Sequence, residues 1–253
     1  MAIGRILFLL TAWGMPTAAA AQDAEVHTFH CLHSCPTGTP ASNDLVVRER
    51  YTLSSNDETK FADWVAYRIT AQSLGGGNRS WRADPWLDPT ETLEPDDYTG
   101  VGDLEIDRGH QAPLASLGGG GLAAETNFLS NITPQMAPLN QNPWRYLEDA
   151  ERDLQRSGRR PVYVLTGPLY EAPRAPLPAA DEPHRVPSAY WKVVVTDDGR
   201  LSAFIMGQDL PRTAAYCDQR ATLDEVERRS GLRLFPRLVR RNFRSLDSAL
   251  GCS

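Results

Sequence analysis

Short runs in which apolar and polar residues partly alternate recur along the chain, and this period of two predicts β-strands. Two such runs cover residues 45–53 and 64–70, a short run rich in β-forming residues covers 162–166, and two apolar runs cover 190–195 and 201–206. The last two flank Asp197-Asp198-Gly199, and apolar runs on either side of Asp-Gly predict a β-hairpin.

Two further segments carry the composition and end signals of helices. Residues 140–157 are rich in Glu, Arg, Leu and Gln, and Gly158 follows them. A second helix begins at Thr222-Leu223-Asp224-Glu225, which has the form of a capping box, and Gly231 closes it. Several strands with only a few helices predict an α+β fold, a mixed α/β body on a central antiparallel sheet.

The segments between these elements indicate no domain boundary. The triplet 75–77 is Gly-Gly-Gly and interrupts the chain, and the loop 84–100 is rich in proline and acids. We expect these acids to be a solvated surface, since the alternative, a calcium loop, needs tighter spacing and a glycine at its turn. They are Asp84, Asp88, Glu91, Glu94, Asp96 and Asp97. There is no repeat and no long linker, so residues 22–253 are predicted to form one domain.

The first residues have the features of a secretory signal peptide. Arg5 precedes the apolar run 6–10, and Thr17 and four alanines precede Gln22. The run is too short to span a bilayer. We therefore expect residues 1–21 to be removed on export to the periplasm or the medium; the alternative is a buried N-terminal helix. No later segment is long and apolar enough to cross a membrane, so no membrane association is expected after removal.

Composition and charge narrow the function. Of the 253 residues, 41% are hydrophobic and 23% are charged, as in ordinary globular proteins. The formal net charge is −6, and loss of Arg5 with the signal peptide makes it −7. This balance excludes a broadly basic nucleic-acid-binding protein. Any nucleic-acid partner must therefore be held by a local basic patch.

Four cysteines, Cys31, Cys35, Cys217 and Cys252, predict two disulfides in an exported chain. Three pairings are possible, and we favour the local one, Cys31 with Cys35 and Cys217 with Cys252. An alternative remains at the N-terminus, where several potential zinc ligands crowd together. These are His27, His30, Cys31, His33 and Cys35.

The segment Asp107-Arg108-Gly109-His110 follows the strand-like residues 104–106 and could place a phosphate binder beside a base. The planar fork of arginine suits phosphate, and the near-neutral pKa of histidine suits proton abstraction. Gly109 would allow backbone to approach a ligand closely. The alternative is that His110 is structural.

A second candidate group lies on the first predicted helix. Asn140, Glu148 and Arg152 are eight and four residues apart, which keeps them within about a third of the helix circumference. An amide oxygen, an acid and a cation would then share one face. The alternative is that Asn140 caps the helix, while Glu148 and Arg152 form a surface ion pair.

The chain resembles the DNA/RNA non-specific endonucleases, and the resemblance covers essentially the whole chain after the signal peptide. The segments that carry it are 61–62, 64–67, 97–100, Asp107 to Ala115, Leu129 to Gln135, Leu139-Asn140-Gln141, Leu147-Glu148-Asp149, Thr166 to Tyr170 and Pro187 to Lys192. The resemblance implies a ββα-metal active site set in the predicted body. It also implies two local disulfides at the four cysteines.

The resemblance assigns roles to single residues. It implies that His110 is the general base and that Asn140 is the one direct protein ligand of a magnesium ion, for which manganese may substitute. Water would fill the remaining positions, which suits magnesium. Glu148 is similar to an acid that holds those waters, and Arg108 to a phosphate-contacting arginine.

Three assignments are less direct. Arg79 and Arg152 are similar to arginines that bind substrate or the transition state, and the glycines before Arg79 can shift its alignment. Asn131 is similar to an asparagine that belongs to the site without an evident direct role.

The implied activity is hydrolysis of single- and double-stranded DNA and RNA to 5′-phosphate and 3′-hydroxyl ends. Two alternatives remain: a module of the same fold that binds nucleic acid without cutting it, and a secreted phosphodiesterase of small nucleotides. The resemblance also suggests a homodimer.

Overall fold

The computed structural model describes residues 25–238 and 243–253. The predicted signal peptide, residues 1–21, lies outside the described residues. The main sheet has the order β1-β2-β3-β6-β7-β8-β10, and β9 also pairs with β8. Neighbouring strands are antiparallel except β8 and β10. The strands are β1 (Asp44–Val47), β2 (Tyr51–Ser55), β3 (Ala62–Ile69), β6 (Val162–Leu169), β7 (Ala189–Thr196), β8 (Arg200–Gly207), β9 (Arg220–Ala221) and β10 (Arg244–Ser245).

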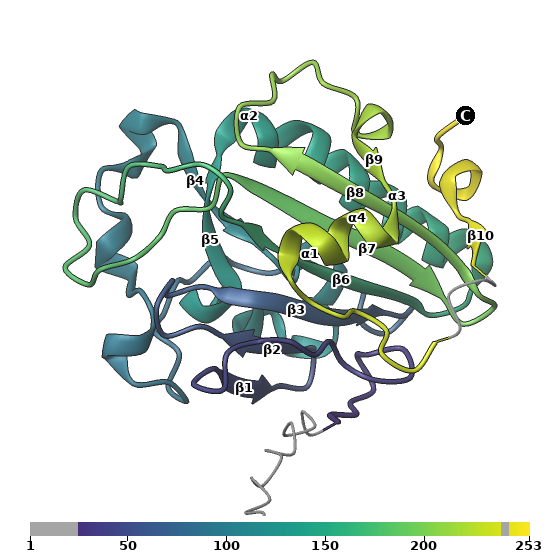
Figure 1. Ribbon diagram of the computed structural model, residues 1–253, viewed down its shortest axis with the longest axis horizontal. Coiled ribbons are helices and arrows are strands. Elements are labelled where there is room, and N and C mark those ends of the chain that lie inside the picture. The colour runs from purple at the N-terminus through teal and green to yellow at the C-terminus, as the bar shows by residue number, and fades with distance from the viewer. Residues whose placement is uncertain (1–24, 239–242) are drawn as a thin grey trace, which may run out of the picture.

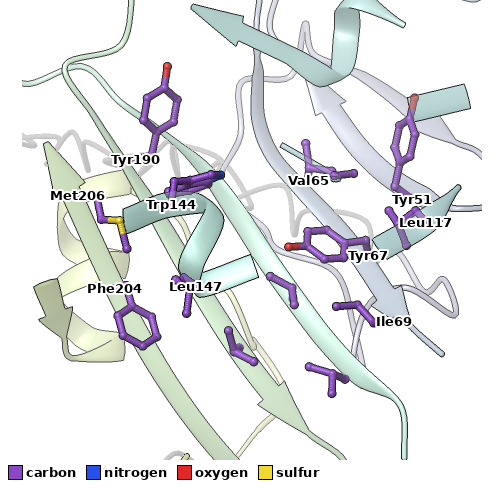
Figure 2. Packing of buried hydrophobic residues seen from close by; sticks show 14 of the residues in the cluster. Tyr51, Val65, Tyr67, Ile69, Leu117, Trp144, Leu147, Tyr190, Phe204 and Met206 are labelled. Carbon is purple, nitrogen blue, oxygen red and sulfur yellow. The ribbon is translucent and has the colours of Figure 1, made fainter. Parts of the chain in front are cut away.

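Helices cover both faces of this sheet. Figure 1 shows α4 (Leu223–Ser230) in front of the strands and α3 (Arg145–Gly158) behind them. All eight residues of β7 are buried, because the strand lies in the centre of the sheet between both layers. Figure 2 shows Trp144 and Leu147 packed over the sheet residues Tyr67 and Tyr190. Val226 of α4 packs in the core on the opposite face.

A second, two-stranded sheet precedes α3. In it β4 (Ile106–His110) pairs antiparallel with β5 (Ile132–Met136). The chain continues through α2 (Ala137–Leu139) and a π-helical turn (Asn140–Trp144) into α3. This is a ββα unit. Hydrogen bonds from Tyr190 and Gln208 to the carbonyl of Pro134 fix it to the main sheet.

The remaining helices are short. Among the described residues they are α1 (Leu114–Leu117) and the 3₁₀ helices Pro89–Glu91, Pro95–Tyr98, Val101–Leu104, Gly119–Gly121, Ala123–Asn127, Leu129–Asn131, Tyr216–Gln219 and Asp247–Leu250.

The α+β prediction with a central antiparallel sheet is confirmed, and several local predictions are corrected. The run 45–53 is two paired strands, because the chain reverses between Val47 and Tyr51. The segment 104–106 is not a strand before the motif: Glu105 is left-handed (φ 54°), and β4 contains the motif itself. The predicted second helix is confirmed, with the Thr222 hydroxyl accepting from the Glu225 amide.

Two acids of the loop 84–100 are buried, which corrects the expectation of a solvated surface. Asp84 pairs with Arg48 and accepts a hydrogen bond of 2.5 Å from the Ser130 hydroxyl. Asp97 accepts from the Glu94 amide at 2.6 Å. Burial of a carboxylate costs less when the group is paired or hydrogen-bonded; Asp84 is both paired and hydrogen-bonded, and Asp97 is hydrogen-bonded.

Disulfides join Cys31 to Cys35 and Cys217 to Cys252, as predicted. The zinc alternative at the N-terminus is therefore wrong, because Cys31 and Cys35 are bonded to each other and His30 bonds to Thr52 and Glu49. Within the described parts of the chain, no helix has the length and apolar character that crossing a bilayer requires.

Candidate active site

A cleft of about 680 Å³ lies between the ββα unit and the loops that precede β4. Every residue predicted for the site lines it, with the exception of Asn131. The charged and polar side chains in its wall are Arg79, Asp107, Arg108, His110, Asn140, Gln141, Arg145, Glu148 and Arg152, and the aromatic ones are Trp81 and Tyr98.

The last residue of β4, His110, is held in one tautomer by a buried asparagine. Its Nε2 atom lies 3.1 Å from Oδ1 of Asn127. The amide nitrogen of Asn127 donates to the carbonyls of Asn78 (3.0 Å) and Ala123 (3.3 Å), which fixes the amide with its oxygen toward the ring. Nε2 must therefore carry the proton, and Nδ1 keeps its lone pair.

Burial, against the opposing effect of the hydrogen bond to Asn127 and with a smaller contribution from the positive charge of Arg79, lowers the pKa of His110 to about 4. The imidazole is thus neutral around pH 7. A neutral ring whose Nδ1 is unprotonated can accept a proton, which is what a general base requires.

Asn140 is oriented by a carboxylate of β4. Its Nδ2 atom donates to Oδ2 of Asp107 at 2.8 Å, and Gln141 donates to the same oxygen at 2.9 Å. The amide oxygen of Asn140 accepts no hydrogen bond from the described residues. This oxygen remains available as a ligand in the wall of the cleft.

The local backbone explains why Asn140 is not a helix cap. Its φ and ψ are −59° and −45°, inside a helical run that already begins at Ala137. Pro143 follows within the π-helical turn, and proline has no amide hydrogen to donate back along a helix. Such wide turns are frequent at functional sites. The N-cap alternative is wrong.

The ion pair postulated between Glu148 and Arg152 is also wrong. Arg152 is 7% exposed; it pairs with Asp149 and donates to the Ser116 hydroxyl at 3.1 Å. Glu148 is instead close to Lys192 of β7, at 3.5 Å. Burial raises the pKa of Glu148 to about 7, with Lys192 and Arg152 acting in the opposite direction.

Two further arginines face the cleft. Arg108 donates to the carbonyl of Pro95 at 3.0 Å, and its guanidinium lies over the rings of Trp81 and Tyr98. Its Nε atom is buried without a partner among the described residues. Arg79 is exposed and lines the same cleft as His110.

Asn131 supports the site from behind. It is fully buried, its Oδ1 accepts from the amide of Ala112, and its Nδ2 donates to the carbonyls of Ala112 and Thr126. It thereby ties the loop after His110 to the start of β5. Gly109 is also required by the structure and not by a ligand. A Cβ at this position would lie 2.4 Å from the Gln135 side chain, so the backbone of Gly109 closely approaches protein.

Sequence reasoning missed four residues of this arrangement. Asp107 was part of the quoted motif but had no role, and Lys192 likewise belonged to a matching segment. Asn127 and Trp81, whose ring centroid lies 5.2 Å from that of His110, carry no periodic or motif signal. Only the fold brings these two beside the histidine.

Comparisons with known proteins identify the relatives of the chain. The profile of the DNA/RNA non-specific endonuclease family matches residues 32–241. A nuclease of Serratia marcescens is 47% identical over 222 residues, covering 85% of this chain and 83% of that protein. Human mitochondrial endonuclease G is 32% identical over 229 residues, covering 81% and 73%.

The fold also matches a solved structure. A chain in the crystal structure of an EndoG/EndoGI complex aligns with a TM-score of 0.68 at 24% identity, over 82% of this chain and 92% of that one. At this identity the likeness concerns the fold alone.

Proposed function

The chain belongs to the DNA/RNA non-specific endonuclease family, and from this premise we propose that it is a secreted, magnesium-dependent endonuclease that cuts DNA and RNA, single- or double-stranded, irrespective of sequence. The observation that supports this most directly is one cleft that combines a neutral His110, the free amide oxygen of Asn140 and several arginines.

His110 acts as the base. Its Nδ1 takes a proton from the water that attacks phosphorus, and the resulting imidazolium donates from Nε2 to Asn127. The cation is formed in a buried site, so it returns its proton readily. Arg108 and Arg79 bind phosphoryl oxygens, since guanidinium groups match phosphate geometry and keep their charge. Arg152, which Asp149 and Ser116 hold in place, binds the substrate from α3.

The cleft fits a magnesium ion. Its wall offers oxygen atoms of Asn140, Asp107 and Glu148, and hard cations prefer such ligands. Asn140 would be the direct ligand, and Glu148 would accept hydrogen bonds from the waters around the ion. Magnesium supplies positive charge to the phosphoryl oxygens when bound. Manganese, which takes the same ligands, is expected to substitute.

Broad substrate range follows from the groups involved. The side chains assigned to the substrate are arginines, which bind phosphate, and contacts to phosphate carry no direct sequence information. Water adds to phosphorus as the bond to the 3′-oxygen breaks, His110 takes the proton of the attacking water, and a second water protonates the departing oxygen, which leaves 5′-phosphate and 3′-hydroxyl ends.

The test is degradation of supercoiled plasmid and of a structured RNA, with magnesium and with EDTA. We expect both substrates to be cut at many sites, and only with the metal. Binding without cleavage would instead identify a non-catalytic module, and hydrolysis of small diesters alone a phosphodiesterase. Mass spectrometry of exported protein tests secretion, with an N-terminus near Gln22 expected and one at Met1 contradicting it.

A further inference from the structure

A lysine lies completely buried beneath the cleft. Lys192 is in the central strand β7, on the same face of the sheet as Tyr190 and Val194, and this face packs against α3. Its exposure is 0%. Lysine is almost never fully buried unless it is paired, so its partners identify its purpose.

Those partners are two glutamates one turn apart on α3. The ammonium Nζ lies 3.2 Å from Oε1 of Glu151 and 3.5 Å from Oε1 of Glu148. The contact with Glu148 has hydrogen-bond geometry, whereas Oε1 of Glu151 has no hydrogen-bond partner among the described residues. The ring of Trp144 lies 4.2 Å from Nζ on another side.

The two glutamates differ in what they face. Glu151 is 0% exposed, and its second oxygen accepts a hydrogen bond of 2.8 Å from the Tyr67 hydroxyl on β3. Glu148 is 13% exposed at its side chain and lines the cleft. Glu151 therefore belongs to the buried network alone, and of the two glutamates only Glu148 can interact with a substrate or ion in the cleft.

We propose that the buried Lys192–Glu151 pair is a positioning device for Glu148: Lys192 orients the Glu148 carboxylate and favours its charged form, and Glu151 limits that effect. The inference rests on the proposed function, because it matters only if Glu148 serves the reaction as an anion. Lys192 attracts the negative charge of Glu148, and Glu151 opposes it by sharing the same ammonium. The other charged and titratable groups near Glu148 are Arg152 on its own helix, Tyr67 on β3 and, around the cleft, Arg79, Asp107, Arg108, His110 and Arg145.

Because the two members of the pair act on Glu148 with opposite sign, their substitutions make opposite predictions. Lys192→Met removes the stabilising cation, so protonation of Glu148 becomes easier and the acid limb of cleavage moves to higher pH. Glu151→Gln removes the competing anion, so the acid limb moves to lower pH. Each shift should be on the order of 1 to 3 pH units, as for charges at such distances. A purely structural pair would lower activity in both variants without opposite shifts.

The experiment measures two quantities on the purified protein: the midpoint of the acid limb of plasmid cleavage at saturating magnesium, and the titration of the Glu148 carboxyl by ¹³C NMR without metal. Glu148→Gln assigns the NMR signal. Glu227→Gln is the matched control, since Glu227 is a buried glutamate of α4 on the other face of the sheet, and neither midpoint should move.

Both midpoints moving in opposite directions in the two variants supports the proposal, and absent or equal-signed shifts overturn it. If Lys192→Met does not fold, the double variant Glu151→Gln/Lys192→Met leaves no isolated buried charge, and its midpoint must lie above that of Glu151→Gln alone. If the wild type cuts no nucleic acid, the proposed function fails, while the carboxyl titration still decides whether the pair controls Glu148.

Discussion

Replacing Asn127 tests how the histidine is prepared for catalysis. Asn127→Ala removes the acceptor 3.1 Å from Nε2 of His110 and frees the ring to place its proton on Nδ1. One hydrogen bond contributes about 0.5 to 1.5 kcal/mol net, which is a factor of roughly 2 to 13 in the ratio of the two tautomers. We therefore expect kcat to fall by about that factor, well short of the roughly 10²- to 10⁴-fold loss typical for removing a general base.

The assay pairs kcat for plasmid cleavage at pH 8 with ¹⁵N NMR of the His110 ring, whose shifts distinguish the two tautomers. Thr126→Val is the control, because its hydroxyl bonds to the same Ala123 carbonyl but does not reach the ring. Both variants should lose stability, and only Asn127→Ala should change the tautomer. An unchanged tautomer with an unchanged rate would refute the role given to Asn127.

Three other predictions concern the roles of His110 and Asn140, the salt dependence of substrate affinity and the pH dependence of stability. His110→Ala should lower kcat by a factor on the order of 10² to 10⁴ with little change in magnesium dependence, whereas Asn140→Ala should raise the magnesium concentration at which cleavage is half-maximal. A titration of cleavage rate against magnesium concentration distinguishes the two effects. Wild-type behaviour of Asn140→Ala would exclude the ligand role of Asn140. Three arginine–phosphate contacts predict a fall in apparent affinity of roughly 40-fold between 50 and 200 mM salt, measured at limiting substrate. Burial lowers the pKa of His30 to about 4, so stability should be full above pH 6.5 and decline as the pH falls toward 4, by on the order of 3 kcal/mol. Urea unfolding of the wild type and His30→Gln measures this, and equal pH dependence of the two would contradict it.

The sequence allowed the sheet class, the hairpin around Asp197, the second helix and both disulfides to be predicted, because each depends on local spacing or on cysteine count. The run 45–53 was wrongly predicted as one strand, since the turn between the mostly exposed β1 and the buried β2 leaves the alternation almost intact. Sequence reasoning placed Asp84 on the surface, because the Arg48 that compensates its burial comes from β1–β2, 36 residues earlier. Long-range compensation of this kind leaves no local trace.

The site was predictable to the extent that its residues share a continuous segment. The ββα unit carries most of the predicted site, namely Arg108, His110, Asn140, Glu148 and Arg152. These residues lie on β4, the π-helical turn and α3, so their spacing in sequence indicates which of them are close in the fold. Asn127 could not be found in this way, because its function depends on two carbonyls, of Asn78 and Ala123, that fix its amide. Lys192 is a charged residue within an otherwise apolar strand. The sequence does not indicate its function, because its partners Glu148 and Glu151 lie on α3 and approach it only in the folded protein.

The protein is negatively charged and so is its proposed substrate, but the charges of the protein are unevenly distributed. The chain carries −6 overall, yet the wall of the cleft presents Arg79, Arg108, Arg145 and Arg152 against the two acids Asp107 and Glu148. At an ionic strength near 0.15 M, charges farther than about 8 Å from a phosphate are largely screened, so the phosphate in the cleft interacts mainly with these groups. Both acids have a role under the proposed function: Asp107 orients Asn140, and Glu148 would accept hydrogen bonds from the waters around a bound ion. A cation held by Asn140 would make the cleft more positive still, which would couple binding of the polyanion to binding of the metal.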